Sequence, residues 1–260
     1  MTVPDHLVLR LRAAGCVFAE DEAALLVAEA RDAAHLEAMV TERVAGRPLE
    51  QVVGWAEFAG LRIVLEPGVF VPRRRTEHLA ALTLELAREA GPRPVVVELC
   101  CGAAAIGAAV LAALPGTDLT VADVDPAAVR AAARNVGGRA LVLEGDLDAP
   151  LPGSLRGRVD VLVANAPYVP TDAVASMPPE ARDHEPLVAL DGGADGLDVA
   201  RRVVACAATW LRPGGHLVVE TSVRQAPALR AAYEEVGLVG QISRDDDRDA
   251  TAVVGRLPVI

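Results

Sequence analysis

Lysine is absent from the 260-residue chain, because all 25 of its basic residues are arginine. P-loop ATPases and enzymes that form a Schiff base need an ammonium group, so the sequence excludes both classes. Acidic residues outnumber basic ones by 36 to 25, and the net charge of −11 argues against a broad surface that grips nucleic acid. We therefore expect a protein or small-molecule partner.

Cysteine is scarce, and its four positions show no metal or disulfide pattern. Cys16, Cys100, Cys101 and Cys206 include no CxxC pair and have no histidine at ligand spacing. We expect neither a metal site nor a disulfide framework. We expect the protein to be located in the reduced cytoplasm. The first twelve residues, MTVPDHLVLRLR, do not read as a signal peptide.

One apolar run, residues 95–114, has about the 20-residue length that a bilayer requires. It begins with three valines, continues with Glu98, and is interrupted by Gly102 and Gly107 before an alanine-rich stretch. A strand, a turn and a helix explain this pattern better than a membrane span.

The chain divides into three predicted parts. Helical patterns cover residues 7–13, 21–30 and 32–44, and residues 52–65 predict two strands joined at Ala59-Gly60. We predict a small helical module at 1–50, a β-hairpin linker at 51–72 and a catalytic domain at 73–260.

Strand-like and helix-like segments alternate from Pro94 onward, which predicts an α/β fold with a mostly parallel sheet covered on both faces. The last strand follows another strand candidate with few residues between, so we expect it to pair antiparallel at the edge. The strand candidates are residues 95–99, 119–123, 140–146, 160–168, 216–220, 238–243 and 251–256.

The first strand-to-helix turn, ELCCGAAAIG at 98–107, is where such folds bring main-chain N–H groups to a ligand. Asp123 ends the second strand 21 residues after Gly102, which is near the spacing for a carboxylate that binds ribose hydroxyls. A helix cap ahead of Pro126 is the alternative for Asp123. The pattern fits a nicotinamide cofactor and S-adenosylmethionine equally. Asp146 could accept from an adenine amine with Leu147 packed on the ring, or simply form a turn.

The fourth strand ends in Asn165-Ala166-Pro167-Tyr168. The Asn165 side-chain carbonyl and the Ala166 main-chain carbonyl can each accept one N–H of a planar amide or aromatic amine, and the Tyr168 ring can cover it. A polar turn closed by proline is the alternative. The position at a strand terminus beside an adenosine site favours the functional interpretation.

At these residues the chain resembles the release factor glutamine methyltransferases, the HemK/PrmC family, and more closely actinobacterial relatives with no assigned substrate. The likeness runs from Arg47 to Arg256. It includes the stretch at 47–77, the NAPY loop, EPLVALDGGADGLDVARR at 185–202, LRPGGHLVVE at 211–220 and the closing RDDDRDATAVVGR.

The resemblance implies a Rossmann-like class I methyltransferase fold that transfers a methyl group from S-adenosylmethionine to a glutamine amide nitrogen, in the family's best-known case that of a release factor. It implies that Asn165, Ala166, Pro167 and Tyr168 hold the substrate. The implied cofactor contacts are Glu98, Cys100, Cys101, Gly102, Ala103, Ala104, Asp123, Asp146, Leu147 and Asn165. Phe70, Arg73 and Glu77 correspond to a stretch that lines the cofactor pocket, and the small module to a domain that recognises the substrate.

Three departures from the family pattern stand out. Ala166 replaces the first proline of the NPPY loop, and the turn lacks glycines at positions 100 and 104. Only 46 residues precede Arg47, fewer than the usual recognition domain. Two alternatives therefore stay open: methylation of an exocyclic amine in nucleic acid or a small molecule, and a cofactor-binding relative without turnover.

Overall fold

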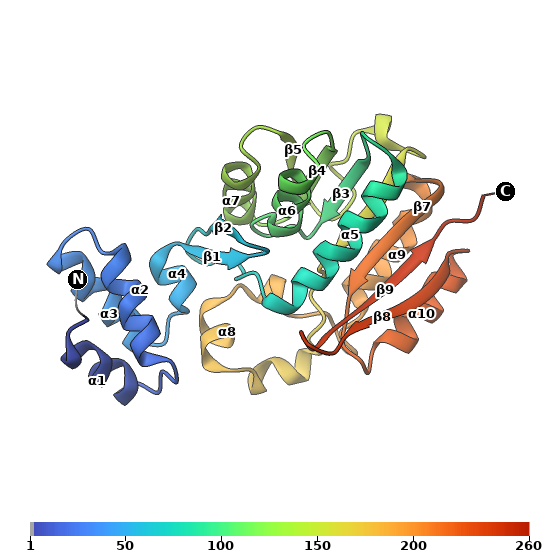
Figure 1. The fold of residues 1–260 in the computed structure, drawn as a ribbon. Coiled ribbons are helices and arrows are strands. Elements are labelled where there is room, and N and C mark those ends of the chain that lie inside the picture. The colour runs from blue at the N-terminus through green and yellow to red at the C-terminus, as the bar shows by residue number, and fades with distance from the viewer. Residues whose placement is uncertain (1–2, 260) are drawn as a thin grey trace.

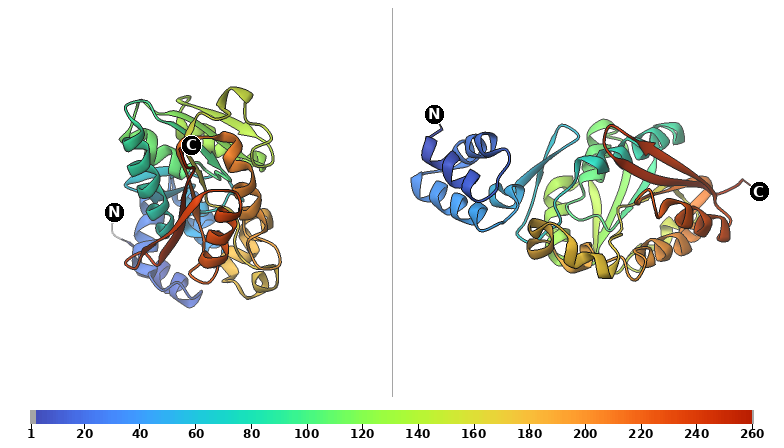
Figure 2. Two further views of the ribbon diagram at one scale, coloured as in Figure 1. Left: turned by 90° about the vertical axis from the view of Figure 1, so that its right-hand side faces the viewer. Right: turned by 90° about the horizontal axis from the view of Figure 1, so that it is seen from below.

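The computed structural model of the chain describes residues 3–259, which form a small helical part, a β-hairpin and a larger α/β part (Figure 1). The helical part lies beside the α/β part, with the hairpin between them (Figure 2). None of the helices in residues 3–259 has both the length and the apolar character that crossing a membrane demands.

Four helices make up the N-terminal part, because apolar side chains at helical spacing share one core that includes Leu11, Leu26 and Val40. Asp32 begins the third helix by accepting a hydrogen bond from the His35 N–H over 2.7 Å. The fourth helix was not predicted from the sequence. The bounds are α1 Asp5–Ala13, α2 Ala19–Glu29, α3 Ala33–Val44 and α4 Leu49–Val53.

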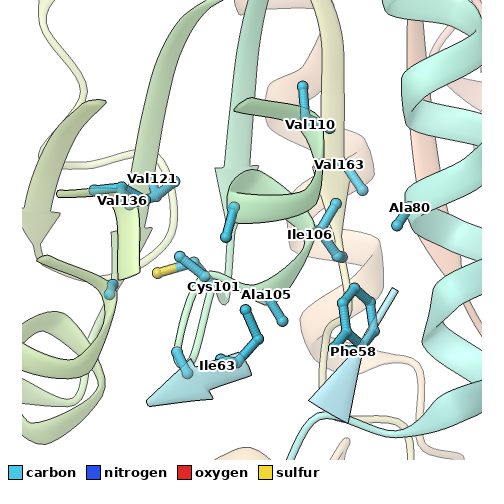
Figure 3. Packing of buried hydrophobic residues seen from close by; sticks show 14 of the residues in the cluster. Phe58, Ile63, Ala80, Cys101, Ala105, Ile106, Val110, Val121, Val136 and Val163 are labelled. Carbon is cyan, nitrogen blue, oxygen red and sulfur yellow. The ribbon is translucent and has the colours of Figure 1, made fainter. Parts of the chain in front are cut away.

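The hairpin consists of β1, Trp55–Phe58, and β2, Leu61–Val64. Its turn lies at Ala59-Gly60 as predicted, and both residues have positive φ, 50° and 74°, which matches the twist of a two-residue hairpin. Phe58 and Ile63 point from the hairpin into the core of the α/β part, where Phe58 lies near Ile106 and Ile63 near Ala105 (Figure 3). The hairpin therefore attaches the helical part to the sheet domain by buried apolar contacts.

Seven strands form one sheet in the order β5-β4-β3-β6-β7-β9-β8. The first five of these run parallel, and β9 is antiparallel to both of its neighbours. This confirms the predicted mostly parallel sheet with an antiparallel edge. The bounds are β3 Val95–Leu99, β4 Asp118–Asp123, β5 Ala140–Glu144, β6 Val159–Ala164, β7 Leu211–Glu220, β8 Val239–Asp245 and β9 Ala250–Arg256.

β9 pairs antiparallel with β8 at this edge, as predicted, and the structure shows that β8 is the outermost strand while β9 lies between β7 and β8. The burial of the two strands gives the reason. An interior strand is covered on both faces, and β9, ATAVVGR, is almost entirely buried, whereas β8, VGQISRD, alternates with exposed polar positions.

Helices cover both faces of the sheet, as predicted. Side chains alternate along β6, so that Val161 and Val163 face the core under α5, α6 and α7, whereas Leu162 and Ala164 face the core under α9 and α10. The bounds are α5 Glu77–Ala90, α6 Ala105–Ala113, α7 Pro126–Val136, α9 Asp198–Trp210 and α10 Ala226–Glu235.

The connection from β6 to α9, residues 165–197, is long and crosses the carboxyl ends of the parallel strands. It contains α8, Pro179–His184, between two 3₁₀ turns, Thr171–Ser176 and Leu187–Ala189. Two further 3₁₀ turns, Arg74–Thr76 and Gly153–Leu155, precede α5 and β6.

Candidate active site

A cavity lies at the carboxyl ends of β3, β4 and β6, between the first strand-to-helix turn and the connection that follows β6. All the site residues predicted from the sequence line it except Ala104 and Glu77. Parallel strands place their carboxyl ends at one edge of the sheet, so turns far apart in sequence meet there.

The turn after β3 has a left-handed backbone at alternate residues. Cys100, Gly102 and Ala104 have φ of 53°, 54° and 55°, so the two non-glycine residues stand where side chains are strained. A Cβ atom added at Gly102 would meet nothing within 4 Å. Ala104, by contrast, is fully buried in the core beneath the turn and does not line the cavity, so its contact with a cofactor stays a prediction.

Asp123 shapes this turn from the end of β4. Its Oδ2 accepts from the Gly102 N–H over 2.7 Å, and its Oδ1 accepts from the Asp125 N–H over 2.9 Å. The helix-cap alternative was wrong, because Asp125 caps α7 by accepting from the Ala127 N–H. Burial raises the pKa of Asp123, and the main-chain hydrogen bonds oppose that effect.

Glu98 is a second carboxyl group among those that line the cavity, and it is almost fully buried. Its Oε2 accepts from the Gly107 N–H over 2.8 Å at the start of α6. Burial raises the pKa of Glu98 to about 8, with a smaller contribution from the nearby Asp123 charge. A positively charged group placed in the cavity would favour the ionised form.

Asp146 and Leu147 lie at the cavity after β5, but Asp146 is already engaged. Its Oδ2 pairs with Arg202 of α9 at 2.7 Å, and both side chains are more than half exposed. Leu147 has a φ of 49° and is buried against the cavity. The contact of Asp146 with an adenine amine stays a prediction.

The loop after β6 presents two free acceptors to the cavity. Asn165 donates from Nδ2 to the Thr76 hydroxyl over 3.3 Å, which orients its amide, and among residues 3–259 no group donates to its Oδ1. Ala166 is buried, and its main-chain carbonyl likewise accepts no hydrogen bond from the described residues. The two oxygens belong to adjacent residues, which line the same cavity as Tyr168.

Three residues that the sequence analysis did not select hold this loop. Gln225 donates from Nε2 to the Tyr168 carbonyl and the Asp195 carbonyl, each over 2.9 Å. Glu220, at the end of β7, accepts from the Tyr168 hydroxyl over 3.3 Å, and Thr76 orients Asn165. The sequence did carry a signal that Glu220 belongs to the site, because Glu220 is a charged residue at the carboxyl end of a buried strand.

The stretch before α5 only partly follows the predicted roles. Phe70 and Arg73 line the cavity as predicted, and so does Arg75, whereas Glu77 lies outside it. Glu77 instead accepts from the Ala59 N–H of the hairpin turn over 3.0 Å. Arg73 pairs with the buried Glu185 at 2.6 Å, which ties this stretch to the connection after α8.

Burial also changes the pKa of the Tyr168 phenol in the loop after β6. It raises the pKa of Tyr168 to about 12, and the neighbouring Glu220 charge adds to the effect. The phenol therefore keeps its proton at neutral pH and cannot serve as a general base there. Among residues 3–259, the groups that line the cavity beside the two free oxygens include hydrogen-bond acceptors and no strong base.

Comparison with known proteins matches residues 60–178 to the model of the methyltransferase small domain. A release factor glutamine methyltransferase of Geobacter sulfurreducens is 34% identical over 84% of this chain and 75% of its own length. A 4-amino-L-phenylalanine/4-methylamino-L-phenylalanine methyltransferase of Streptomyces pristinaespiralis is 36% identical over 76% of this chain and 69% of its own length. The structure of a ribosomal protein L11 methylase from Lactobacillus delbrueckii subsp. bulgaricus shares the fold, with a TM-score of 0.54, 17% identity and coverage of 76% and 86%.

Proposed function

Because the chain belongs to the release factor glutamine methyltransferase family, we propose that it methylates the side-chain amide of a glutamine in a peptide chain release factor. The family and the methyltransferase domain make S-adenosylmethionine the methyl donor. The proposal includes the release factor as the protein partner and the roles of the individual site residues. It also includes the division of the chain into a helical module at 1–50, a hairpin linker at 51–72 and a catalytic domain at 73–260.

The residues of the cavity fit this cofactor. The open space beside Gly102 allows a ligand to approach the main chain closely, where any side chain would intervene. The Glu98 carboxyl suits an ammonium group, and the Asp123 carboxylate retains lone pairs for ribose hydroxyls although it already accepts two main-chain N–H groups. When bound, S-adenosylmethionine supplies an electrophilic methyl group, whose bond to sulfur breaks while the sulfur keeps the electron pair.

The free acceptor pair of Asn165 and Ala166 is the observation that carries the proposal. An amide nitrogen is a weak nucleophile, because its lone pair is delocalised into the carbonyl. Two acceptors can take both N–H groups and aim the nitrogen along the line of transfer, which is worth roughly 7–11 kcal/mol of a barrier. Pre-aimed acceptors add about 2.7–4 kcal/mol. The nitrogen then forms the new bond to carbon and gives up one proton to water, so the site needs no strong base.

The N-terminal helical module is the proposed recognition part for the protein substrate. Its surface exposes Leu9, Val17 and Phe18, with 63%, 82% and 69% of each residue accessible, and such apolar side chains are common where proteins bind one another. The net charge of −11 disfavours nucleic acid as the partner, and we place the reaction in the cytoplasm.

The test is to incubate the purified chain with isotope-labelled S-adenosylmethionine and a release factor, and to locate the label by mass spectrometry. We expect label on the glutamine of the GGQ sequence. A release factor in which this glutamine is replaced by asparagine is the matched control. Label on another residue, or none while the chain binds S-adenosylmethionine, would refute the protein substrate.

An aromatic amine is the second candidate substrate. The relative from S. pristinaespiralis carries the name of a 4-amino-L-phenylalanine methyltransferase and is as similar to this chain as the release factor enzymes are. An aniline nitrogen has the same planar N–H₂ group and would meet the same two acceptors. 4-Amino-L-phenylalanine therefore forms a second arm of the assay.

A further inference from the structure

Glu220 is a buried carboxyl group beside the cavity that does not line it. It ends β7, where it is only 3% exposed, and it lies behind the wall that Arg75 and Tyr168 form. A second cavity lies on the far side of this wall, and Glu220, Arg75 and Tyr168 all border it. Glu220 is therefore placed to act on the wall and not on the substrate.

Two side chains of the wall contact the same oxygen of Glu220. The Tyr168 hydroxyl donates to Oε1 over 3.3 Å, and the Arg75 Nε lies 3.5 Å from the same atom. The Arg75 guanidinium also lies over the Tyr168 ring, 5.8 Å from its centre. One carboxylate thus holds the tip of the ring and the cation that covers its face.

The main chain of the same tyrosine is held separately. Gln225 donates to the Tyr168 carbonyl over 2.9 Å, so the residue is fixed at its backbone by Gln225 and at its phenol by Glu220. Contacts at the backbone and at the phenol together restrict the orientation of the ring in the cavity. That orientation decides whether its face lies against a planar amide held by Asn165 and Ala166.

The surroundings of Glu220 argue against a role in packing alone. Its Oε2 is buried and has no hydrogen-bond partner among the described residues. Burial raises the pKa of Glu220, opposed by the Thr76 hydroxyl and the Arg75 charge. A buried acidic group with an unpaired oxygen is unfavourable, and an apolar residue of the same volume would pack there more easily.

We propose that Glu220 is a positioning residue for methyl transfer, which acts by fixing the Tyr168 ring and the Arg75 guanidinium at the wall of the active site. This inference rests on the proposed function, because the ring is positioned for the amide substrate. It predicts that Glu220 matters for turnover and much less for binding of S-adenosylmethionine.

The experiment compares Glu220→Ala and Glu220→Gln with the unaltered chain. We expect Glu220→Ala to lower kcat by about 10–100-fold, because a misplaced contact group costs up to about 100-fold, while the Kd for S-adenosylmethionine changes by less than about threefold. Glu220→Gln should retain most of the rate, because its carbonyl oxygen can still accept from Tyr168. An equal loss in both variants, or a loss of cofactor affinity that accounts for the lower rate, would overturn the proposal.

A double-mutant cycle with Tyr168→Phe shows whether the effect passes through the phenol. Once the hydroxyl is absent, adding Glu220→Ala should lower kcat by no more than about threefold further, because residues that act on one contact are not additive. An undiminished effect of Glu220→Ala in the Tyr168→Phe background would contradict the proposed route.

A spectroscopic readout separates this proposal from the choice of substrate. The chain has two tyrosines, Tyr168 and Tyr233, so ring-labelled tyrosine gives two sets of NMR signals that Tyr168→Phe assigns. Glu220→Ala should shift or broaden the Tyr168 ring signals and leave those of the buried Tyr233 in place. Unchanged Tyr168 signals would refute the positioning role, whichever substrate the unaltered chain methylates.

Asp160→Asn is the matched control. Asp160 is also a buried carboxyl group with an arginine partner, Arg212, but it lies at the start of β6, at the opposite edge of the sheet. We expect this variant to leave kcat and the Tyr168 signals unchanged. The same change in both variants would show a general effect of removing a buried charge, and would overturn the specific role of Glu220.

Discussion

The Gly102 N–H donates to Oδ2 of Asp123 over 2.7 Å, and this hydrogen bond joins the turn after β3 to the end of β4. The other oxygen of the carboxylate accepts from Asp125, so one side chain sets the main chain on both sides of the cavity. A carboxylate has about four lone-pair positions, and the two that remain can accept ribose hydroxyls. The same group therefore shapes the site and offers a contact to the ligand.

Asp123→Ala should weaken both the fold and the binding of S-adenosylmethionine. Loss of the acceptor leaves two main-chain N–H groups without partners, which lowers the free energy of unfolding by about 1–3 kcal/mol. We expect the Kd to rise by at least about tenfold, equivalent to about 1.4 kcal/mol. Calorimetry and denaturant unfolding measure the two effects.

Asp32→Ala is the matched control, because it removes the cap of α3 in the helical module. It should lower stability by about 0.5–2 kcal/mol and leave the Kd unchanged. An equal loss of affinity in both variants would show that Asp123 acts only through stability.

Glu98 makes the stability of the chain depend on pH in a defined direction. Its pKa is about 8 in the folded chain against an ordinary value of 4.5, so between these values the folded chain holds a proton that the unfolded chain has released. The unfolding free energy therefore falls as the pH rises from 4.5 to about 8, by up to about 1.4 kcal/mol per pH unit from this group. Above that pKa, this group contributes no further change.

Glu98→Gln removes this titration while its amide oxygen can still accept from Gly107. We expect the difference in unfolding free energy between variant and unaltered chain to grow in favour of the variant from pH 5 to pH 8. Urea unfolding at pH 5, 6.5 and 8 gives the difference at each pH. Parallel pH profiles would contradict the raised pKa.

Gly102→Ala should weaken cofactor binding in addition to lowering stability. The backbone is left-handed there, with φ of 54°, and nothing lies within 4 Å of the added Cβ, so the folded chain loses about 1–2 kcal/mol through conformation alone. The new methyl group would occupy space of the cavity, and we expect the Kd to rise by more than about tenfold.

Gly137→Ala tests whether that loss is specific. Gly137 ends α7 with φ of 57°, and a Cβ there also meets nothing within 4 Å, but the residue does not line the cavity. The two variants should be destabilised alike, and only Gly102→Ala should bind S-adenosylmethionine more weakly. Equal affinities would refute the close approach of the ligand to Gly102.

Much of the sheet was predictable, because its signals are local. The parallel strands follow from short apolar runs separated by helical patterns, and the Ala59-Gly60 turn follows from the two strands beside it. The place of β9 was not predictable from adjacency in sequence. It depends on which of two strands has both faces covered, and only the assembled sheet determines that.

The lining of the cavity was predictable where a residue ends a strand, as Asp123 does, or directly follows one, as Asn165 does. Contacts across the cavity were not, because Thr76 and Gln225 reach the loop from segments 89 and 57 residues away along the chain. Ala104 shows that a position in the turn does not by itself place a residue at the cavity. Its sequence position belongs to the turn, but its side chain points into the core, and only the backbone conformation decides between the two.

Ala166→Pro restores the proline of the family loop and should stabilise the chain. No described group accepts a hydrogen bond from the Ala166 N–H, so proline removes no contact there. A smaller loss of backbone freedom raises stability by about 0.4–1 kcal/mol if the ring fits the buried position. Turnover should persist, because the acceptor is the main-chain carbonyl. Thermal unfolding and an activity assay test this, and a lower midpoint would show that the ring does not fit.

Asn165→Ala tests the acceptor pair directly. It removes Oδ1 and with it one of the two oxygens free to hold the substrate amide, whereas the Ala166 carbonyl remains. Loss of one pre-aimed polar contact lowers kcat by about 10²–10³-fold, equivalent to about 2.7–4 kcal/mol of transition-state stabilisation. The fold should persist, because the residue is half-buried and its one hydrogen bond, to Thr76, is long at 3.3 Å. Thermal unfolding checks the fold, and turnover at saturating cofactor isolates the chemical step. An unchanged rate would show that another group orients the nitrogen, and the proposed chemistry at the end of β6 would fail.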